Sequence, residues 1–168
     1  MRTIIILQNP AVVPLLEDFI QTLDQALVVN RTNEAIPLHK KDTTILNRRD
    51  LKEHWREDLA LTAEDRVILD GTGGNGIEHE LEALRAQCAE APILVLTKTS
   101  DAEAGSGLQD TVSYLSLSDV LTGQLSQCWK KFENRKKTLA LQQLTAGHEH
   151  ILILTQHDPD PEDRKSVV

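Results

Sequence analysis

The stretch that decides the fold runs from Arg66 to Thr97 and reads RVILDGTGGNGIEHELEALRAQCAEAPILVLT. It opens with the apolar run 67–69, which is typical of a strand buried on both faces. Glycines interrupt that run, and apolar residues then recur at helical spacing until Pro92. A second apolar run, 93–96, follows. A strand, a helix and a second strand predict a βαβ unit with parallel strands, whose functional groups gather at the strands' carboxyl ends.

Composition limits the kinds of protein to which this chain can belong. Its 168 residues suit one domain, or one domain with a tail, and a hydrophobic content of 40% is enough for a core. The net charge of −8 argues against DNA as a partner, because the phosphate backbone selects basic surfaces. No apolar run reaches membrane-spanning length and the chain begins without a signal-peptide pattern, so we expect a cytoplasmic protein without a membrane partner.

The remaining elements follow from the same periodicities. Strands are expected at residues 2–8, 26–29 and 111–115, and helices at 10–23, at 50–59 and from 118 or 119 to about 144. Cys88 and Cys128 fall on apolar helical faces, which favours packing in a reducing compartment over a disulfide. The predicted fold is a three-layer α/β sandwich around a five-stranded parallel sheet with an extended C-terminal helix. Residues 1–133 form the α/β domain, and residues 134–168 form a helical extension and polar tail.

Two segments leave alternatives open. Residues 31–50 are polar and weakly patterned, which favours a solvated loop, with room for one edge strand near 43–46. The alternative is a basic rim for an anion, supplied by Arg31, Lys40, Lys41, Arg48 and Arg49. The apolar run 151–154 fits either a continued helix or an edge strand.

Histidines and carboxylates gather near the C-terminus, but their spacing matches no standard metal site. The residues concerned are His148, His150, His157, Asp158 and Asp160. We therefore predict no metal and no cofactor.

The order of these features resembles a response-regulator receiver domain over residues 2–130. Asp70 stands where that family keeps its phospho-accepting aspartate, at the end of the third strand, and the helix after Gly76 resembles the one that follows it. Thr97 and Tyr114 stand at the family's switch positions on the fourth and fifth strands. The resemblance implies a flavodoxin-like, or more broadly Rossmann-like, fold and a role in signal transduction.

The departures from that family concern the chemistry of phosphorylation. Receivers place acidic residues after the first strand to hold Mg²⁺, whereas this chain has Gln8, Asn9 and Pro10, and neutral amides are poor ligands for a hard dication. The family's lysine after the fifth strand is also absent from the sequence 114–118, so no cation stabilises a transferred phosphoryl group. We interpret the chain as a degenerate receiver, or pseudo-receiver, with Asp70 as a vestigial phosphoacceptor.

Such a protein is expected to act through protein contacts rather than catalysis. In receivers the fourth helix, fifth strand and fifth helix form the interaction face. Leu121, Leu125, Trp129 and Phe132 are the candidate interface residues, although packing of the helix against the sheet is expected to bury two of them. The long last helix indicates a homodimer or coupling to an output domain.

The glycine-rich turn supports a second hypothesis. Such a turn between a strand and a helix presents backbone N–H groups to an anion. It matches neither a P-loop nor a dinucleotide fingerprint, but it is similar to the Thr-Gly-Gly loops of CRISPR-associated Rossmann-fold domains that sense cyclic oligoadenylates. That similarity implies a cyclic nucleotide ligand or a small cyclic-nucleotide hydrolase; the alternative is a flexible turn without a ligand. The loop residues are Gly71, Thr72, Gly73, Gly74, Asn75 and Gly76.

Overall fold

The computed structural model describes residues 1–38, 40–73, 76–98, 111–121 and 123–145. By its internal contacts the chain divides into two units, Met1–Trp129 and Lys130–Val168. The first unit is an α/β domain built around one parallel sheet. Some predicted features fall outside the described residues: loop positions Gly74 and Asn75, the apolar run 151–154, and the C-terminal histidines and aspartates.

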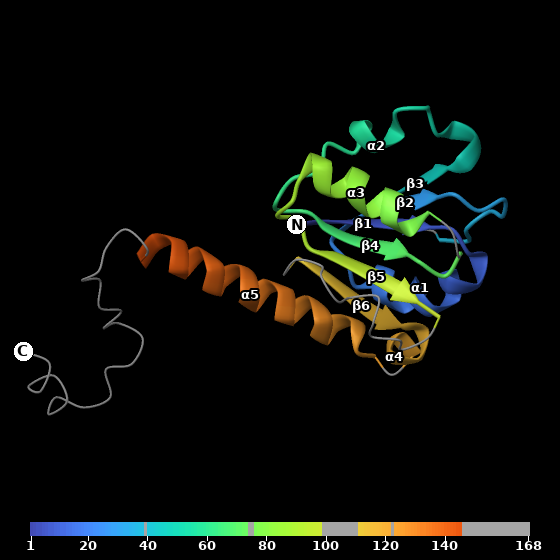
Figure 1. Ribbon diagram of the computed structural model, residues 1–168. Helices are drawn as coiled ribbons and strands as arrows, with labels where there is room; N and C mark the ends of the chain where they lie inside the picture. The colour runs from blue at the N-terminus through green and yellow to red at the C-terminus, as the bar shows by residue number, and fades with distance from the viewer. Residues whose placement is uncertain (39, 74–75, 99–110, 122, 146–168) are drawn as a thin grey trace, which may run out of the picture. The chain divides into compact units, whose positions relative to one another are not determined.

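The sheet has six parallel strands in the order β3-β2-β1-β4-β5-β6 (Figure 1). From β1 the chain builds outward through β2 and β3, and from β4 it builds outward in the opposite direction. The order therefore reverses between β1 and β4, and in open α/β sheets ligands bind in the crevice outside such a switch point. The strands are β1 (Arg2–Leu7), β2 (Gln25–Asn30), β3 (Thr43–Asn47), β4 (Arg66–Asp70), β5 (Ile93–Thr97) and β6 (Val112–Ser116).

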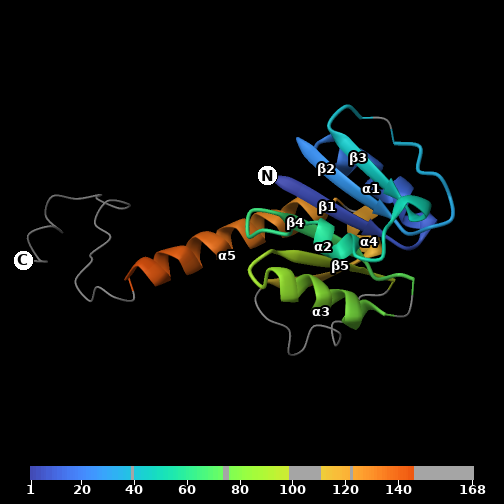
Figure 2. The same cartoon turned by 90° about the horizontal axis from the view of Figure 1, so that it is seen from above.

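Helices cover both faces of this sheet, which makes three layers. Helices α2 and α3 lie on one face and α1 and α4 lie on the other (Figures 1 and 2). Asn9 accepts a hydrogen bond from the Ala11 amide and so caps the turn that leads into α1, as its sequence position predicts. The bounds are η1 (Pro10–Val12), α1 (Val13–Gln21), η2 (Arg48–Asp50), α2 (Trp55–Asp58), α3 (Ile77–Gln87), α4 (Leu117–Leu121) and α5 (Leu125–Thr145).

The core follows from strands that are apolar on both faces. Ile4, Ile6 and Leu69 are fully buried in a cluster with Leu81 and Leu84 of α3. The residues between them, such as Ile5 and Ile68, are equally buried because alternate side chains point to the other face. Each such side chain contributes about 1.5–3 kcal/mol by leaving water. With aromatic residues at only 3% of the chain, aliphatic burial supplies most of the core.

The predicted count of five strands was wrong, because β3 is a sixth. It pairs along its whole length with β2 and forms the edge of the sheet, and its residues are half-buried or exposed. An edge strand packs against one neighbour only, so it needs no continuous apolar run. Its sequence, TTILN, therefore resembles the polar loop around it.

Two predicted helices also differ from the structure. Residues 50–59 do not form one helix: Asp50 lies in the short 3-10 helix η2, and α2 begins only at Trp55. The last predicted helix is two helices, α4 and α5, and Gly123 lies between them with a φ of +79°. That backbone conformation favours glycine and commonly ends a helix. The helix is therefore interrupted at Gly123, although the apolar residues continue at helical spacing beyond it.

None of the helices in the described ranges is both long and apolar enough to cross a membrane. Cys88 and Cys128 are not joined in a disulfide, and both are half-buried.

A buried ionic cluster joins α2, α3 and the segment after β2. Glu80 of α3 is only 3% exposed, and its Oε1 lies 2.5 Å from Arg31 Nη1. Arg56 of α2 binds the same carboxylate through two nitrogens, and its Nε–Oε2 distance is 2.8 Å. Both guanidinium groups also lie over the ring of Trp55. Burial raises the pKa of Glu80, but the hydrogen bonds and charges of Arg56 and Arg31 outweigh that effect and hold it below its ordinary value.

We predict that Glu80→Gln lowers the free energy of unfolding by about 2 kcal/mol at pH 7, because two partly buried cations lose their anion. The folded pKa of Glu80 lies below the unfolded value of about 4.3. Its contribution is therefore fully present above that value and is lost as the pH falls through the folded pKa. Urea denaturation from pH 7 to pH 3 should show the two proteins converging at the acid end.

The matched control is Glu82→Gln, which removes one carboxylate from an exposed position of the same helix. It should change stability by less than about 0.5 kcal/mol at every pH. A difference between wild type and Glu80→Gln that stayed constant down to pH 3 would contradict the ionic origin of the effect.

Candidate functional site

The carboxylate of Asp70 joins the carboxyl ends of β1 and β4, the two strands at which the sheet order reverses. Asp70 is 0% exposed. Its Oδ2 accepts hydrogen bonds from the backbone amides of Gln8, at 2.9 Å, and Asn9, at 2.7 Å. Its Oδ1 accepts from the Thr72 amide at 2.9 Å and from the Thr72 hydroxyl at 2.6 Å. These four donors replace the hydrogen bonds that the carboxylate would make to water. Because they come from the segments after β1 and after β4, the carboxylate anchors two loops.

The same network continues into the turn after β1. The Asn9 side-chain amide donates to Thr72 Oγ1 at 3.2 Å, while its carbonyl oxygen accepts from the Ala11 amide at 3.0 Å. Thr72 is buried. The Asn9 side chain thus links the turn after β1 to Thr72 in the loop after β4.

The first glycine of the loop is required by close packing. A Cβ on Gly71 would lie 2.6 Å from the Leu96 carbonyl oxygen and 2.7 Å from Cδ1 of Ile77. The Gly71 amide donates to that same carbonyl at 2.8 Å and extends the ladder between β4 and β5. The pairing of β4 with β5 therefore continues one residue past Asp70.

The two switch-like positions lie on β5 and β6. Thr97 ends β5, one residue beyond Leu96, the register partner of Asp70, and its hydroxyl lies 3.5 Å from the Leu115 carbonyl oxygen. Tyr114 is half-buried beside the core that α3 covers. Burial raises the pKa of Tyr114, and the charge of Glu78 adds to that shift. Thr97 lies at the carboxyl end of β5, the strand beside that of Asp70, whereas Tyr114 lies in the middle of β6, one strand further out.

The residues that follow Leu115 form a compact polar turn. Ser116 is buried, and its hydroxyl donates to Asp119 Oδ2 at 2.8 Å. The Ser118 hydroxyl lies 2.9 Å from that of Ser116. These groups bind each other at the start of α4, and the turn contributes no cation to the neighbourhood of Asp70.

The four candidate interface residues fall into different environments. Leu125 and Trp129 are buried, which agrees with the packing role that we expected for two of the four. Leu121, at the end of α4, is 70% exposed. The side chain of Phe132 lies outside the part of α5 that the structure describes.

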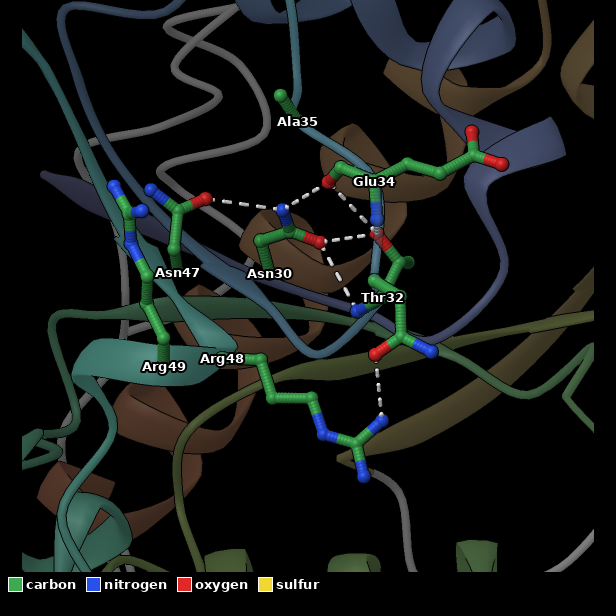
Figure 3. A pocket seen from close by; sticks show the side chains of 8 residues that line it. Asn30, Thr32, Glu34, Ala35, Asn47, Arg48 and Arg49 are labelled. Carbon is green, nitrogen blue, oxygen red and sulfur yellow. Dashed lines mark hydrogen bonds between the residues drawn. The ribbon is translucent and has the colours of Figure 1, made fainter.

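A cavity of about 430 Å³ opens at the carboxyl ends of β2 and β3 (Figure 3). Asn30 is buried at its base, where its amide donates to the Glu34 carbonyl oxygen at 2.8 Å and to Asn47 Oδ1 at 3.1 Å. Asn30 Oδ1 accepts from both the amide and the hydroxyl of Thr32. The lining residues are Asn30, Thr32, Asn33, Glu34, Ala35, Asn47, Arg48 and Arg49.

Sequence reasoning named the two arginines of this cavity as a possible basic rim but missed the asparagines. The available signal was Asn30, a polar residue at the end of an apolar strand, paired in register with Asn47 at the end of the next strand. The chain between them has no regular pattern, so only the pairing of β2 with β3 brings these residues together. Glu80 was missed for a related reason, because acidic residues on a helix usually face solvent.

Within the described ranges, no group of three or more His, Cys, Asp and Glu side chains lies close enough to hold a metal ion. Comparison of the chain with models of protein families, with curated proteins and with solved structures found no match. The candidate site is therefore defined by its geometry.

We predict that Asp70→Asn lowers the free energy of unfolding by about 2–3 kcal/mol, since buried donors lose their acceptor. The NH₂ group of the new side chain is a donor, and it would face donors that bind a carboxylate oxygen in the wild type. Amide hydrogen exchange should accelerate at Gln8, Asn9 and Thr72 before it does in the centres of β1 and β4. Urea denaturation and exchange monitored by NMR measure the two effects.

Asp18→Asn is the control, since Asp18 is exposed on α1, and it should alter neither quantity. Unchanged exchange at Gln8 and Asn9 in Asp70→Asn would contradict the anchoring role of the carboxylate.

Proposed function

We propose that this protein is a non-catalytic regulatory module that resembles a degenerate receiver domain. It acts by contact with a protein partner or with a second copy of itself, and not by its own phosphorylation.

The observation that carries this proposal is the state of the Asp70 carboxylate. A phospho-accepting aspartate must present one oxygen to the incoming phosphoryl group beside a divalent ion. Asp70 is fully buried, and both of its oxygens already accept hydrogen bonds, three of them from backbone amides. Phosphorylation would have to break the junction between the β1 and β4 loops, so a structural role for this carboxylate is favoured.

Exposed leucines supply candidate contact surfaces. Leu121 lies on the first unit and is 70% exposed. In the second unit, Leu144 is 68% exposed and Leu141 is 39% exposed, and a separation of three residues places them on the same side of α5. We assign the extension of this helix beyond Trp129 a role in dimerisation or in coupling to an output domain, because apolar side chains on a helix are commonly covered by another helix.

We predict that Leu121→Glu weakens self-association at least tenfold, because it places a charge in an apolar contact. Sedimentation velocity over a range of concentrations measures the effect. Beryllofluoride with Mg²⁺, which imitates a phosphoryl group, should leave the wild-type sedimentation profile unchanged.

Gln124→Glu is the matched control, since it adds the same charge at a nearby exposed position without removing a leucine. Equal association of Leu121→Glu and wild type would contradict a contact through this surface. A change of oligomeric state in beryllofluoride would contradict a module that works without phosphorylation.

Nucleotide sensing is the second candidate function, and the strand order favours it. The reversal between β1 and β4 is the arrangement of dinucleotide-binding folds, in which the ligand occupies the crevice at the carboxyl ends. The loop that begins at Gly71 lies at this crevice and is fixed by the Asp70 network. A module of this kind would bind a cyclic or linear nucleotide as its signal; its contact surfaces would still transmit the response.

This function predicts a thermal shift with cyclic di- or oligonucleotides that Gly73→Asp reduces or abolishes. The new carboxylate would repel phosphate, while the closest groups to its Cβ belong to the flexible side chain of Gln8. Gln25→Glu, which adds an equal charge at an exposed position at the amino end of β2, is the control. A nucleotide shift of the same size in Gly73→Asp would exclude the loop as the binding site.

A further inference from the structure

We propose that the cavity at the ends of β2 and β3 binds the phosphate-bearing part of a nucleotide, with Arg48 and Arg49 as its anion-binding groups. This inference rests on the second candidate function and assigns its phosphate to a place outside the glycine-rich loop.

The floor of the cavity is preorganised. Asn30 is 1% exposed and uses both ends of its amide, so it holds the segment 32–34 against Asn47 of the neighbouring strand. The Thr32 hydroxyl strengthens this turn by donating to Asn30 Oδ1 at 2.6 Å. A site whose backbone is already fixed loses less conformational freedom when a ligand binds.

The two arginines supply a positive charge that the cavity does not neutralise. Arg48 donates to the neutral side chain of Asn33 at 3.1 Å, and the contact of Arg49 with Asp50 is long, at 3.8 Å, between exposed groups. Glu34 also lines the cavity, but its carboxylate points away from both guanidinium groups (Figure 3). An exposed ion pair contributes little, and the amide of Asn33 does not neutralise Arg48, so each guanidinium remains able to bind phosphate oxygens in two-pronged geometry.

Size and position favour a nucleotide over a free anion. A volume of about 430 Å³ falls within the range of small-molecule sites, and it exceeds what a single phosphate needs. The cavity lies at the carboxyl edge of the sheet, where open α/β sheets bind ligands. A second cavity, of about 300 Å³, contains Arg2 and Lys41 but lies at the amino ends of β2 and β3, so basic residues alone do not distinguish the proposed site.

The test is calorimetric titration of the full chain with AMP, ADP, cyclic dinucleotides, adenosine and inorganic phosphate. We expect at least one phosphorylated nucleotide to bind, adenosine to bind at least tenfold more weakly, and the double variant Arg48→Ala, Arg49→Ala to lose affinity at least tenfold. Raising the salt concentration should weaken wild-type binding more than binding to the double variant.

Lys41→Ala, in the cavity at the amino edge, is the matched control and should bind as wild type does. Two results overturn the assignment of the phosphate site: binding that the double variant retains in full, or inorganic phosphate alone binding as tightly as any nucleotide. If Gly73→Asp abolishes binding and the arginine variant does not, the nucleotide-sensing function is supported and the cavity of Arg48 and Arg49 is rejected as the phosphate site. If no nucleotide binds wild type, both are rejected, while the contact surfaces of the first proposal are unaffected.

Discussion

The buried carboxylate of Asp70 is the interaction on which the carboxyl edge of this sheet depends. A charge removed from water is costly unless donors replace its hydration, and here three backbone amides and one hydroxyl do so. Two amides belong to the turn after β1, and the other two donors belong to Thr72, after β4. One side chain therefore fixes the relative positions of the two loops that flank the reversal of strand order.

An aspartate at the end of a central strand can serve either as a reactive group or as an anchor, and the contacts of Asp70 favour the anchor. Position at the end of a central strand is common to both roles. Reactivity, however, requires a free oxygen, a metal and a compensating cation, whereas anchoring requires saturation by hydrogen bonds. The backbone amides of Gln8 and Asn9 supply half of the donors that the anchoring role requires.

A second buried carboxylate, Glu80, joins helix α3 to the segment after β2. Arg31 follows β2 directly, and its binding to Glu80 connects the segment that leads to the Arg48–Arg49 cavity with helix α3. Buried carboxylates thus hold both Arg31, which follows β2, and Thr72, which follows β4. Ligand sites benefit from such support, because groups held in advance lose less freedom on binding.

The sequence by itself determined the α/β class, the βαβ unit of residues 66–97, and the positions of five strands. Most of these segments are continuous apolar runs, as expected for strands buried on both faces of a parallel sheet, whereas residues 111–115 alternate. It also identified Asp70 as a residue at a strand's carboxyl end. Only the tertiary structure decided that a sixth strand, Thr43–Asn47, joins the edge, since one-sided packing leaves little pattern in sequence. Tertiary structure alone also paired Asn30 with Asn47, buried Glu80 between two arginines, and gave Asp70 two of its four donors from residues 61 and 62 positions away along the chain. Periodicity reports whether a residue faces the core, whereas the identity of its partner depends on which strands become neighbours.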